Sequence, residues 1–177
     1  MATEIATLSS GCFWCTEAVL RRLKGVESVT SGYTGGKLPD PTYEEVCAGA
    51  SGHAEAVQVA FDPDVIPFES ILDVFFATHD PTTLNRQGND VGTQYRSGIF
   101  YNSEEQKQAA EAAIAKIDAS GEYPSKVVTE VTPFSGFYPA EEYHQDFYER
   151  NRDYPYCRVI IDPKVTKLYK SYEPLTV

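Results

Sequence analysis

The stretch Glu4-Ile5-Ala6-Thr7-Leu8-Ser9-Ser10-Gly11-Cys12-Phe13-Trp14-Cys15 decides how the chain folds, because a strand pattern changes to a helix pattern within it. Residues 4–9 are predicted to form a short strand, and residues 12–24 a helix with an imperfect apolar stripe. Gly25 follows as a stop signal for that helix. Two thiols and two aromatic rings are therefore expected where the first strand turns into the first helix.

Further elements follow along the chain. Runs typical of strands occur at 26–31, 54–61, 97–101 and 127–131, and apolar spacing predicts helices that begin at Pro67 and Ser103 and one over 140–150. Residues 37–52 and 79–96 are expected to be loops, the second ordered and rich in turns. The polar stretch from Asn151 to Val177 is expected to be irregular.

The first six elements follow the order β-α-β-β-α-β, which matches the ferredoxin-like arrangement. We therefore expect an α+β fold in which helices cover a mixed sheet, with extra helices after this core. A chain of 177 residues fits one domain. We expect that domain to span residues 1–177, with an irregular C-terminal tail over 158–177.

Composition narrows the class of protein. The net charge is −11, which argues against a nucleic-acid partner, because such binding depends on clustered Lys and Arg. No run approaches the ~18 apolar residues of a membrane span, so we expect no membrane partner. The N-terminus has no basic segment followed by an apolar core, which favours the cytoplasm over secretion. We also expect a monomer.

The two cysteines of the opening stretch suggest redox chemistry. A thiol at a helix start faces unpaired N–H groups, which lowers its pKa from ~8.5 and makes Cys12 a nucleophile. Cys15 lies one turn further, within disulfide reach, so the pair could store two electrons. Two alternatives are a pair of buried, inert cysteines and a zinc site completed by Cys47 with His53 or Cys157, although the chain has no second close cysteine pair.

Glu55 is the second candidate catalytic group. It shares a strand face with Val57, Val59 and Phe61, so burial should raise its pKa and make it a neutral proton donor near pH 7. The alternative is a surface glutamate on an edge strand. Three more candidates, Tyr33, Asp90 and Tyr95, lie in segments rich in glycine or turns, where functional side chains gather.

Six blocks of the chain, in order, resemble the class A peptide methionine sulfoxide reductases. They are residues 11–14 (GCFW), 32–36 (GYTGG), 52–57 (GHAEAV), 79–83 (HDPTT), 85–97 (NRQGNDVGTQYRS) and 140–146 (AEEYHQD). The resemblance implies reduction of the S epimer of methionine sulfoxide, free or within proteins, without a cofactor or a metal.

The resemblance also implies residue roles. Cys12 would attack the sulfoxide sulfur and become a sulfenic acid, while Glu55 would protonate the oxygen. Tyr33 and Tyr95 would donate hydrogen bonds to the sulfoxide oxygen. Phe13 and Trp14 would form the apolar wall that holds the S-methyl group. Asp90 would help to orient the site. A second thiol would then form a disulfide with Cys12, and thioredoxin would reduce it.

One position departs from the family pattern, which usually has glycine where this chain has Cys15. The cysteine-bearing, glycine-rich tail of many members is also missing, although Cys157 lies where some members keep a resolving thiol. We favour Cys15 as the resolving cysteine, with Cys157 as the alternative or a second relay, and we expect Cys47 to be non-essential. Alternative functions are a general dithiol–disulfide oxidoreductase and a zinc-stabilised binding module.

Overall fold

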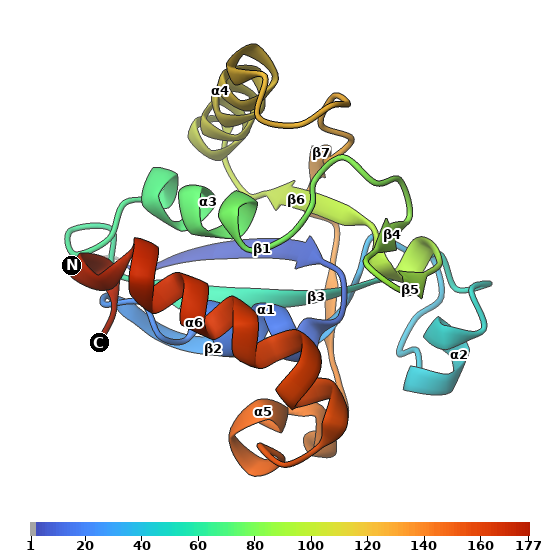
Figure 1. The fold of residues 1–177 in the computed structure, drawn as a ribbon. Coiled ribbons are helices and arrows are strands. Elements are labelled where there is room, and N and C mark those ends of the chain that lie inside the picture. Colours follow the sequence, from blue (N-terminus) through green and yellow to red (C-terminus); the bar gives the residue numbers. More distant parts are fainter. Residues whose placement is uncertain (1–2) are drawn as a thin grey trace.

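The computed structural model describes residues 3–177, which form a mixed six-stranded sheet with the order β7-β6-β1-β3-β2-β8 (Figure 1). The strands are β1 (Glu4–Ser10), β2 (Val26–Thr34), β3 (Ala54–Phe61), β6 (Ser97–Tyr101), β7 (Glu130–Pro133) and β8 (Phe137–Pro139). Only β6 and β7 pair in parallel; the other neighbours in this sheet are antiparallel. A separate small hairpin joins β4 (Arg86–Gln87) to β5 (Asp90–Val91).

The described helices surround this sheet. They are α1 (Phe13–Leu20), α2 (Tyr43–Cys47), α3 (Phe68–Ala77), α4 (Glu104–Ser120), α5 (Phe147–Arg150) and α6 (Asp162–Ser171). Helix α1 packs on β2 and β3, and Figure 1 shows α6 crossing in front of α1. A mixed α+β fold was predicted, and the structure confirms it.

Local patterns account for the central elements. On β3, Glu55, Val57, Val59 and Phe61 point to one buried face, as their period of two predicts. The apolar positions of α3 recur at helical spacing, and Pro67 precedes the helix as its N-cap. The strands predicted at 54–61 and 97–101 are correct to the residue.

Two predicted boundaries are wrong near the site. Helix α1 ends at Leu20, before the predicted end at residue 24, because the next residues pair with the C-terminus through a bridge from Leu23 to Thr176. Strand β2 continues through Tyr33, where a turn was predicted, because this part pairs with both β3 and β8. At Gly32 a Cβ would lie 2.5 Å from the Tyr138 carbonyl oxygen, so glycine allows this close strand approach.

The predicted loop over 37–52 contains the short helix α2. Thr42 caps it: its side chain accepts from the Glu45 amide, and the Glu45 side chain accepts from the Thr42 amide. This reciprocal capping box holds a helix of only five residues. The later strands also differ from the prediction, since β7 begins at Glu130 and the aromatic segment after it forms β8.

The irregular tail predicted over 158–177 is wrong. A π-helical turn over Cys157–Ile161 leads directly into α6. Four apolar residues at helical spacing are buried in this segment: Cys157, Ile161, Val165 and Leu168. This short apolar stripe is enough to hold the helix on the core. The helix predicted over 140–150 is also wrong: Asp146, with a φ of 54°, separates a 3-10 turn from α5.

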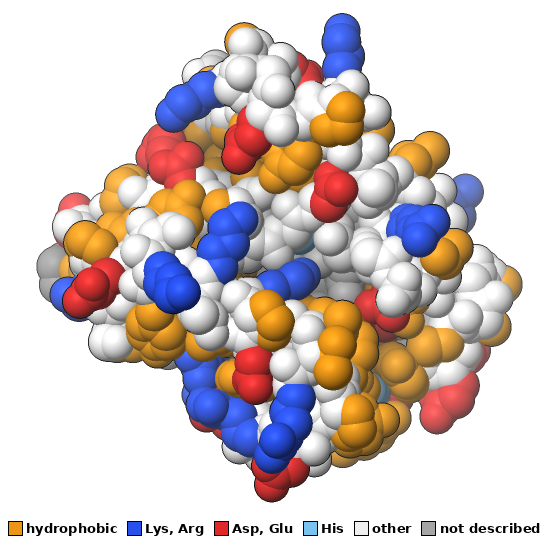
Figure 2. All heavy atoms as spheres, viewed as in Figure 1, with side chains coloured by type: hydrophobic (Ala, Val, Ile, Leu, Met, Phe, Trp, Pro, Cys, Tyr) orange, Lys and Arg blue, Asp and Glu red, His pale blue; other side chains and the backbone are white. Residues whose placement is uncertain are grey.

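Charges on the surface are largely paired around α5. In Figure 2, basic side chains gather on the lower part of the view and are mixed with acidic ones. Ion pairs there join Arg21 to Asp146, Arg150 to Glu142, and both Arg22 and Arg152 to Glu149. None of the helices within residues 3–177 has the length and apolar character needed to cross a membrane.

Candidate active site

Cys12 lies at the junction between β1 and α1, as predicted. It is the N-cap residue of α1 and is 9% exposed, so its side chain is largely buried. Gly11 makes the turn with a φ of +93°, and a Cβ there would lie 2.7 Å from Cβ of Gln87. Glycine is therefore required to deliver Cys12 to this position.

The acidity of the thiols differs from the prediction. Burial raises the pKa of Cys12 well above its usual value, and a hydrogen bond with Cys15 and the nearby Glu55 add to the rise. The hydrogen bond from Cys12 lowers the pKa of Cys15 to about 7. Because each thiol shifts the pKa of the other, the first ionisation belongs to the pair, and one thiolate is available near neutral pH. The helix N-terminus alone does not activate Cys12, because burial outweighs it.

Glu55 is buried beside Cys12, as predicted, and is only 1% exposed. Its Oε1 accepts a hydrogen bond of 3.1 Å from the amide of Phe13, the residue next to Cys12. Its Oε2 is buried without a hydrogen-bond partner among residues 3–177. Burial raises the pKa of Glu55 to about 8, so the carboxyl is protonated at neutral pH and can donate from the oxygen that is not bonded. The alternative of an edge-strand glutamate is wrong, because β3 lies between β1 and β2.

Phe13 and Trp14 form aromatic surfaces next to Cys12. Phe13 is fully buried, whereas Trp14 is half-buried and packs against both buried clusters. The Trp14 ring stacks on Phe147 with centroids 3.7 Å apart and an interplanar angle of 6°. Its Nε1 donates to Nδ1 of His144 at 3.0 Å. A rigid apolar wall therefore stands beside the reactive thiol.

The predicted tyrosines lie in different places. Tyr95 is half-buried against the cysteine cluster, and burial raises its pKa, with Glu55 and Cys12 adding to the rise. Tyr33 is fully buried, and its hydroxyl donates to Oε1 of Glu141 at 2.7 Å. The hydroxyl of Tyr33 is therefore occupied by Glu141, and this contact does not support its predicted role at the sulfoxide oxygen.

Tyr43 is a tyrosine that the sequence interpretation missed. It is the first residue of α2, and its ring stacks on Phe13 with centroids 6.4 Å apart. Burial raises its pKa, and the nearby Glu55 is the next largest cause. Tyr43 thus faces Phe13 and Glu55 together with Tyr95. The Thr42–Glu45 capping pair was the sequence signal that could have placed this residue on an ordered helix.

Asp90 is linked to the site by a hydrogen bond from Tyr156, a second tyrosine that the sequence interpretation missed. The Tyr156 hydroxyl donates to Oδ2 of Asp90 at 2.7 Å and lies 3.7 Å from Sγ of Cys15. The Tyr156 ring meets Trp14 edge-on, with centroids 5.8 Å apart. Because Tyr156 precedes α6, only the folded C-terminal segment brings it over the cysteines.

Both candidate resolving cysteines belong to the same buried cluster as Cys12. Cys15 and Cys157 are buried in one cluster with Cys12, bounded by residues of α1, α5 and α6. Burial raises the pKa of Cys157, and the neighbouring Cys15 adds to the rise. Cys47 is exposed at the end of α2 and is outside this cluster.

The metal alternative does not fit the geometry. His53 is occupied away from the cysteines: Nδ1 accepts from the Gly36 amide, and Nε2 bonds the Leu38 carbonyl. Residues 3–177 contain no group of three or more His, Cys, Asp and Glu side chains placed to hold a metal ion.

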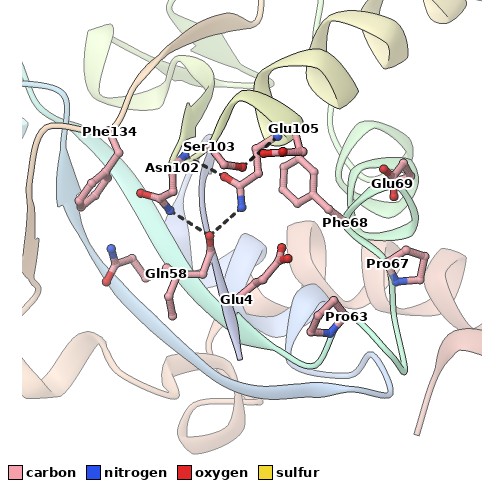
Figure 3. Close-up of a pocket in the computed structure, with 12 residues that line it drawn as sticks. Glu4, Gln58, Pro63, Pro67, Phe68, Glu69, Asn102, Ser103, Glu105 and Phe134 are labelled. Atoms are coloured by element: carbon pink, nitrogen blue, oxygen red, sulfur yellow. Dashed lines mark hydrogen bonds between the residues drawn. The ribbon is translucent and has the colours of Figure 1, made fainter. Parts of the chain in front are cut away.

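A large cavity, of about 650 Å³, lies elsewhere (Figure 3). Glu4, Gln58, Phe68 and Phe134 are among its lining residues, which places it at the opposite end of β1 from Cys12. None of the candidate site residues lines it.

Comparison with known proteins agrees with this geometry. The family model for peptide methionine sulfoxide reductase matches residues 4–175. The chain is 59% identical to peptide methionine sulfoxide reductase MsrA of Sulfolobus acidocaldarius over 169 residues, covering 96% of this chain and 95% of the relative.

Solved structures give the same result. Reduced Mxr1 of Saccharomyces cerevisiae superposes with a TM-score of 0.79 at 37% identity, covering 88% of this chain and 89% of that one. Mxr1 in complex with Trx2 superposes with a TM-score of 0.56 at 30% identity, covering 82% and 84%. With the shared fold and the paired Cys12 and Glu55, the chain belongs to the peptide methionine sulfoxide reductase family, and it reduces methionine sulfoxide in a thiol-dependent reaction.

Proposed function

We propose that Cys12 is the nucleophile and Glu55 the general acid in the reduction of methionine S-sulfoxide. Proton transfer within the Cys12–Cys15 pair leaves the charge on Cys12, whose sulfur attacks the sulfoxide sulfur. Glu55 protonates the oxygen, and the oxygen passes to Cys12 as the sulfur–oxygen bond of the substrate breaks. The products are methionine and a Cys12 sulfenic acid, so the substrate gains the two electrons that Cys12 loses.

The position of the Glu55 carboxyl supports this proposal most strongly. The Phe13 amide holds one oxygen 3.1 Å away, and the other oxygen is unpaired among residues 3–177. With its pKa at about 8, the group carries a proton at neutral pH while the cysteine pair, with a pKa of about 7 at Cys15, supplies a thiolate. An acid and a nucleophile are thus ready at the same pH.

The remaining side chains would hold the substrate. Tyr95 and Tyr43 would donate hydrogen bonds to the sulfoxide oxygen, with Tyr43 taking the role first assigned to Tyr33. Phe13 and Trp14 would accept the S-methyl group. Asp90 would orient the site through its hydrogen bond with Tyr156, which lies over Cys15.

Cys15 would resolve the sulfenic acid, and Cys157 would act as a second relay. The hydrogen bond between Cys12 and Cys15 supports the first step, in which the Cys15 thiol forms a disulfide and releases water. The burial of Cys157 in the same cluster supports exchange of this disulfide onto Cys157. Thioredoxin would then supply the two electrons; Mxr1 of yeast, a relative, has been solved in complex with Trx2.

The proposal also covers the type of fold, the number of domains, the oligomeric state and the cellular location. The order β6-β1-β3-β2 with antiparallel neighbours supports the ferredoxin-like description of the core. A single catalytic domain, a monomeric state and a cytoplasmic location remain predictions from the sequence.

Mass spectrometry after one turnover tests the proposed roles. The enzyme, reduced and freed of reductant, is mixed with one equivalent of purified methionine S-sulfoxide, which limits the reaction to one turnover, and is then blocked with a thiol reagent and digested. We expect one methionine per enzyme and a disulfide among Cys12, Cys15 and Cys157, with Cys47 blocked as a free thiol. Cys12→Ser should form no methionine; methionine release by this variant would contradict the assignment of the nucleophile.

A Cys157→Ser variant separates the resolving routes. If Cys15 resolves first, this variant still forms a Cys12–Cys15 disulfide in the first turnover and is slowed only when thioredoxin must recycle it. A stable sulfenic acid in Cys157→Ser would instead show that Cys157 resolves directly.

A further inference from the structure

Glu17 is a buried carboxylate on α1 that the proposed reaction does not use. It is 2% exposed, and both of its oxygens accept hydrogen bonds from the Asp146 amide, at 3.0 and 3.1 Å. The neighbouring Phe147 amide acts on the same carboxyl by lowering its pKa. Glu17 therefore binds the backbone of the turn over residues 144–147 that opens α5 (Figure 1).

The turn that Glu17 binds carries both partners of Trp14. Phe147 stacks on the indole at 3.7 Å, and His144 accepts its N–H at 3.0 Å. Burial lowers the pKa of His144, so the ring stays neutral and Nδ1 remains free to accept. The two contacts fix the plane of the indole from different sides.

Trp14 and Glu17 belong to the same helix face. A spacing of three residues places them next to each other on α1, so both can face one turn of the neighbouring segment. Arg21 follows four residues after Glu17 and pairs with the side chain of Asp146. Helix α1 thus holds Asp146 by its amide and by its carboxylate.

The turn needs such support. Asp146 has a left-handed backbone with a φ of 54°, which costs free energy in a residue other than glycine. Helix α5, of only four residues, cannot hold itself in place without tertiary contacts. The buried Glu17 carboxyl supplies this support, because both of its oxygens accept from the Asp146 amide.

We propose that Glu17 is a positioning residue of the reductase: by binding the Asp146 amide, it fixes Phe147 and His144 against Trp14 and so sets the shape of the S-methyl pocket. The effect of Glu17 on binding of the substrate's S-methyl group rests on the proposed role of Trp14. The positioning of the indole by Glu17 does not depend on that role, and the two can be tested separately.

Glu17→Gln and Glu17→Ala test the proposal, with Trp14, the single tryptophan of the chain, as a fluorescent reporter. Burial raises the pKa of Glu17 to about 7, so measurements are made at pH 8, where the carboxylate is mostly ionised. We expect red-shifted emission and easier acrylamide quenching in the folded variants, because the indole becomes less tightly packed. KM for methionine S-sulfoxide should rise about tenfold in Glu17→Ala and less in Glu17→Gln, with kcat within about twofold.

Phe147→Leu is the second variant, since it removes the stacked ring and leaves Glu17 intact. It should reproduce the rise in KM. In the double variant Glu17→Gln/Phe147→Leu, the fold-increase in KM over the unmodified enzyme should be clearly smaller than the product of the two single fold-increases, because both changes act through Trp14. Fully additive effects on KM would overturn the proposal. So would unchanged Trp14 emission and unchanged KM in Glu17→Ala.

Glu149→Gln is the matched control. This carboxylate joins α5 to Arg22, which lies just beyond the end of α1, and to Arg152, but it is not bonded to the turn over 144–147. We expect a lower melting temperature with unchanged Trp14 emission and KM; a shift equal to that of Glu17→Gln would overturn a specific role for Glu17. Trp14→Phe separates the two proposals: an unchanged KM there would refute the substrate role of Trp14, while the emission of the Glu17 variants still decides the positioning.

Discussion

Glu55 illustrates how one side chain can favour activity at the expense of stability. Its pKa of about 8 exceeds the usual carboxyl value because burial disfavours the charged form. The folded state therefore holds a proton that the unfolded chain loses at lower pH. The raised pKa of Glu55 therefore contributes to the free energy of unfolding. This contribution is fully present below the ordinary carboxyl pKa and is lost as pH rises through about 8.

Glu55→Gln should consequently be less active and, in alkali, more stable. We expect the rate of sulfoxide reduction to fall by about 10²–10⁴, because the proton donor is lost. The free energy of unfolding should exceed that of the unmodified enzyme at pH 9, and the difference should shrink towards pH 5. Urea unfolding at the two pH values measures this; a stability difference that does not change with pH would contradict the pKa.

The pH profile of the enzyme should be bell-shaped. Activity needs a thiolate on the cysteine pair, which forms above about pH 7, and a protonated Glu55, which is lost above about pH 8. We expect the alkaline limb to be missing in Glu55→Gln, since glutamine does not titrate. Measuring kcat/KM from pH 5 to pH 10 in both proteins tests the assignment, and an alkaline limb kept in the variant would contradict it.

Tyr43 and Tyr33 make a matched pair of variants. Tyr43→Phe should lower kcat/KM by about 5- to 30-fold, the effect of one hydrogen bond that strengthens in the transition state. Tyr33→Phe should lower stability with little change in rate, because its hydroxyl binds Glu141. Steady-state kinetics and thermal melts of both proteins decide the matter; the reverse pattern would restore the first assignment of Tyr33.

Among the elements, α2 shows how a cap can support catalysis. The helix has five residues and carries Tyr43 at its first position, so its persistence depends on Thr42 and Glu45. Glu141 adds a second anchor, since its Oε2 accepts from the Tyr43 amide at 2.9 Å. These contacts hold the Tyr43 backbone from both sides.

Thr42→Ala should weaken α2 by about 1 kcal/mol, which is the usual cost of removing such a cap. Because α2 is short, the loss should appear as faster amide exchange in residues 43–47 and lower kcat/KM rather than as global unfolding. Thr42→Ser keeps the hydroxyl and is expected to behave like the unmodified enzyme. Unchanged exchange in Thr42→Ala would contradict a supporting role for the cap.

Over the whole molecule, the C-terminal segment determines the environment of the cysteines. It supplies Cys157 and Tyr156, and α6 anchors both through Leu168, which is fully buried in the main core. The chain then returns to α1, where Thr176 forms a bridge with Leu23. Residues from both ends of the sequence therefore enclose one site.

Leu168→Ala should destabilise the protein by about 2–5 kcal/mol, the range for a buried leucine that leaves a cavity. Because α6 holds Cys157, the multi-turnover rate should fall more than the formation of methionine in the first turnover. Lys170→Ala, on the exposed side of the same helix, is the control and should change stability by less than about 0.5 kcal/mol. Equal melting temperatures for the two variants would contradict the anchoring role of Leu168.

Local patterns in the sequence predicted the parts of the fold that depend on neighbouring residues. The alternation of β3 predicted both the strand and the burial of Glu55, and Gly11 with the change of period predicted Cys12 at the start of a helix. Six motif blocks predicted the family. These features are visible because strand period, helix spacing and turn glycines act over a few residues.

Only the tertiary structure decided how the opening stretch is completed. Tyr43, Tyr156 and Cys157 reach it through contacts across more than 25 residues, and Tyr33 turns away because Glu141, 108 positions later, takes its hydroxyl. The pKa of Cys12 is raised, although the sequence predicted that it would be lowered, because burial by α5 and α6 outweighs the effect of the helix N-terminus. The sequence by itself determined the family and predicted Cys12 as the nucleophile and Glu55 as the acid. Packing between distant segments decided the protonation of these two groups and their neighbours, because desolvation depends on everything that covers a group.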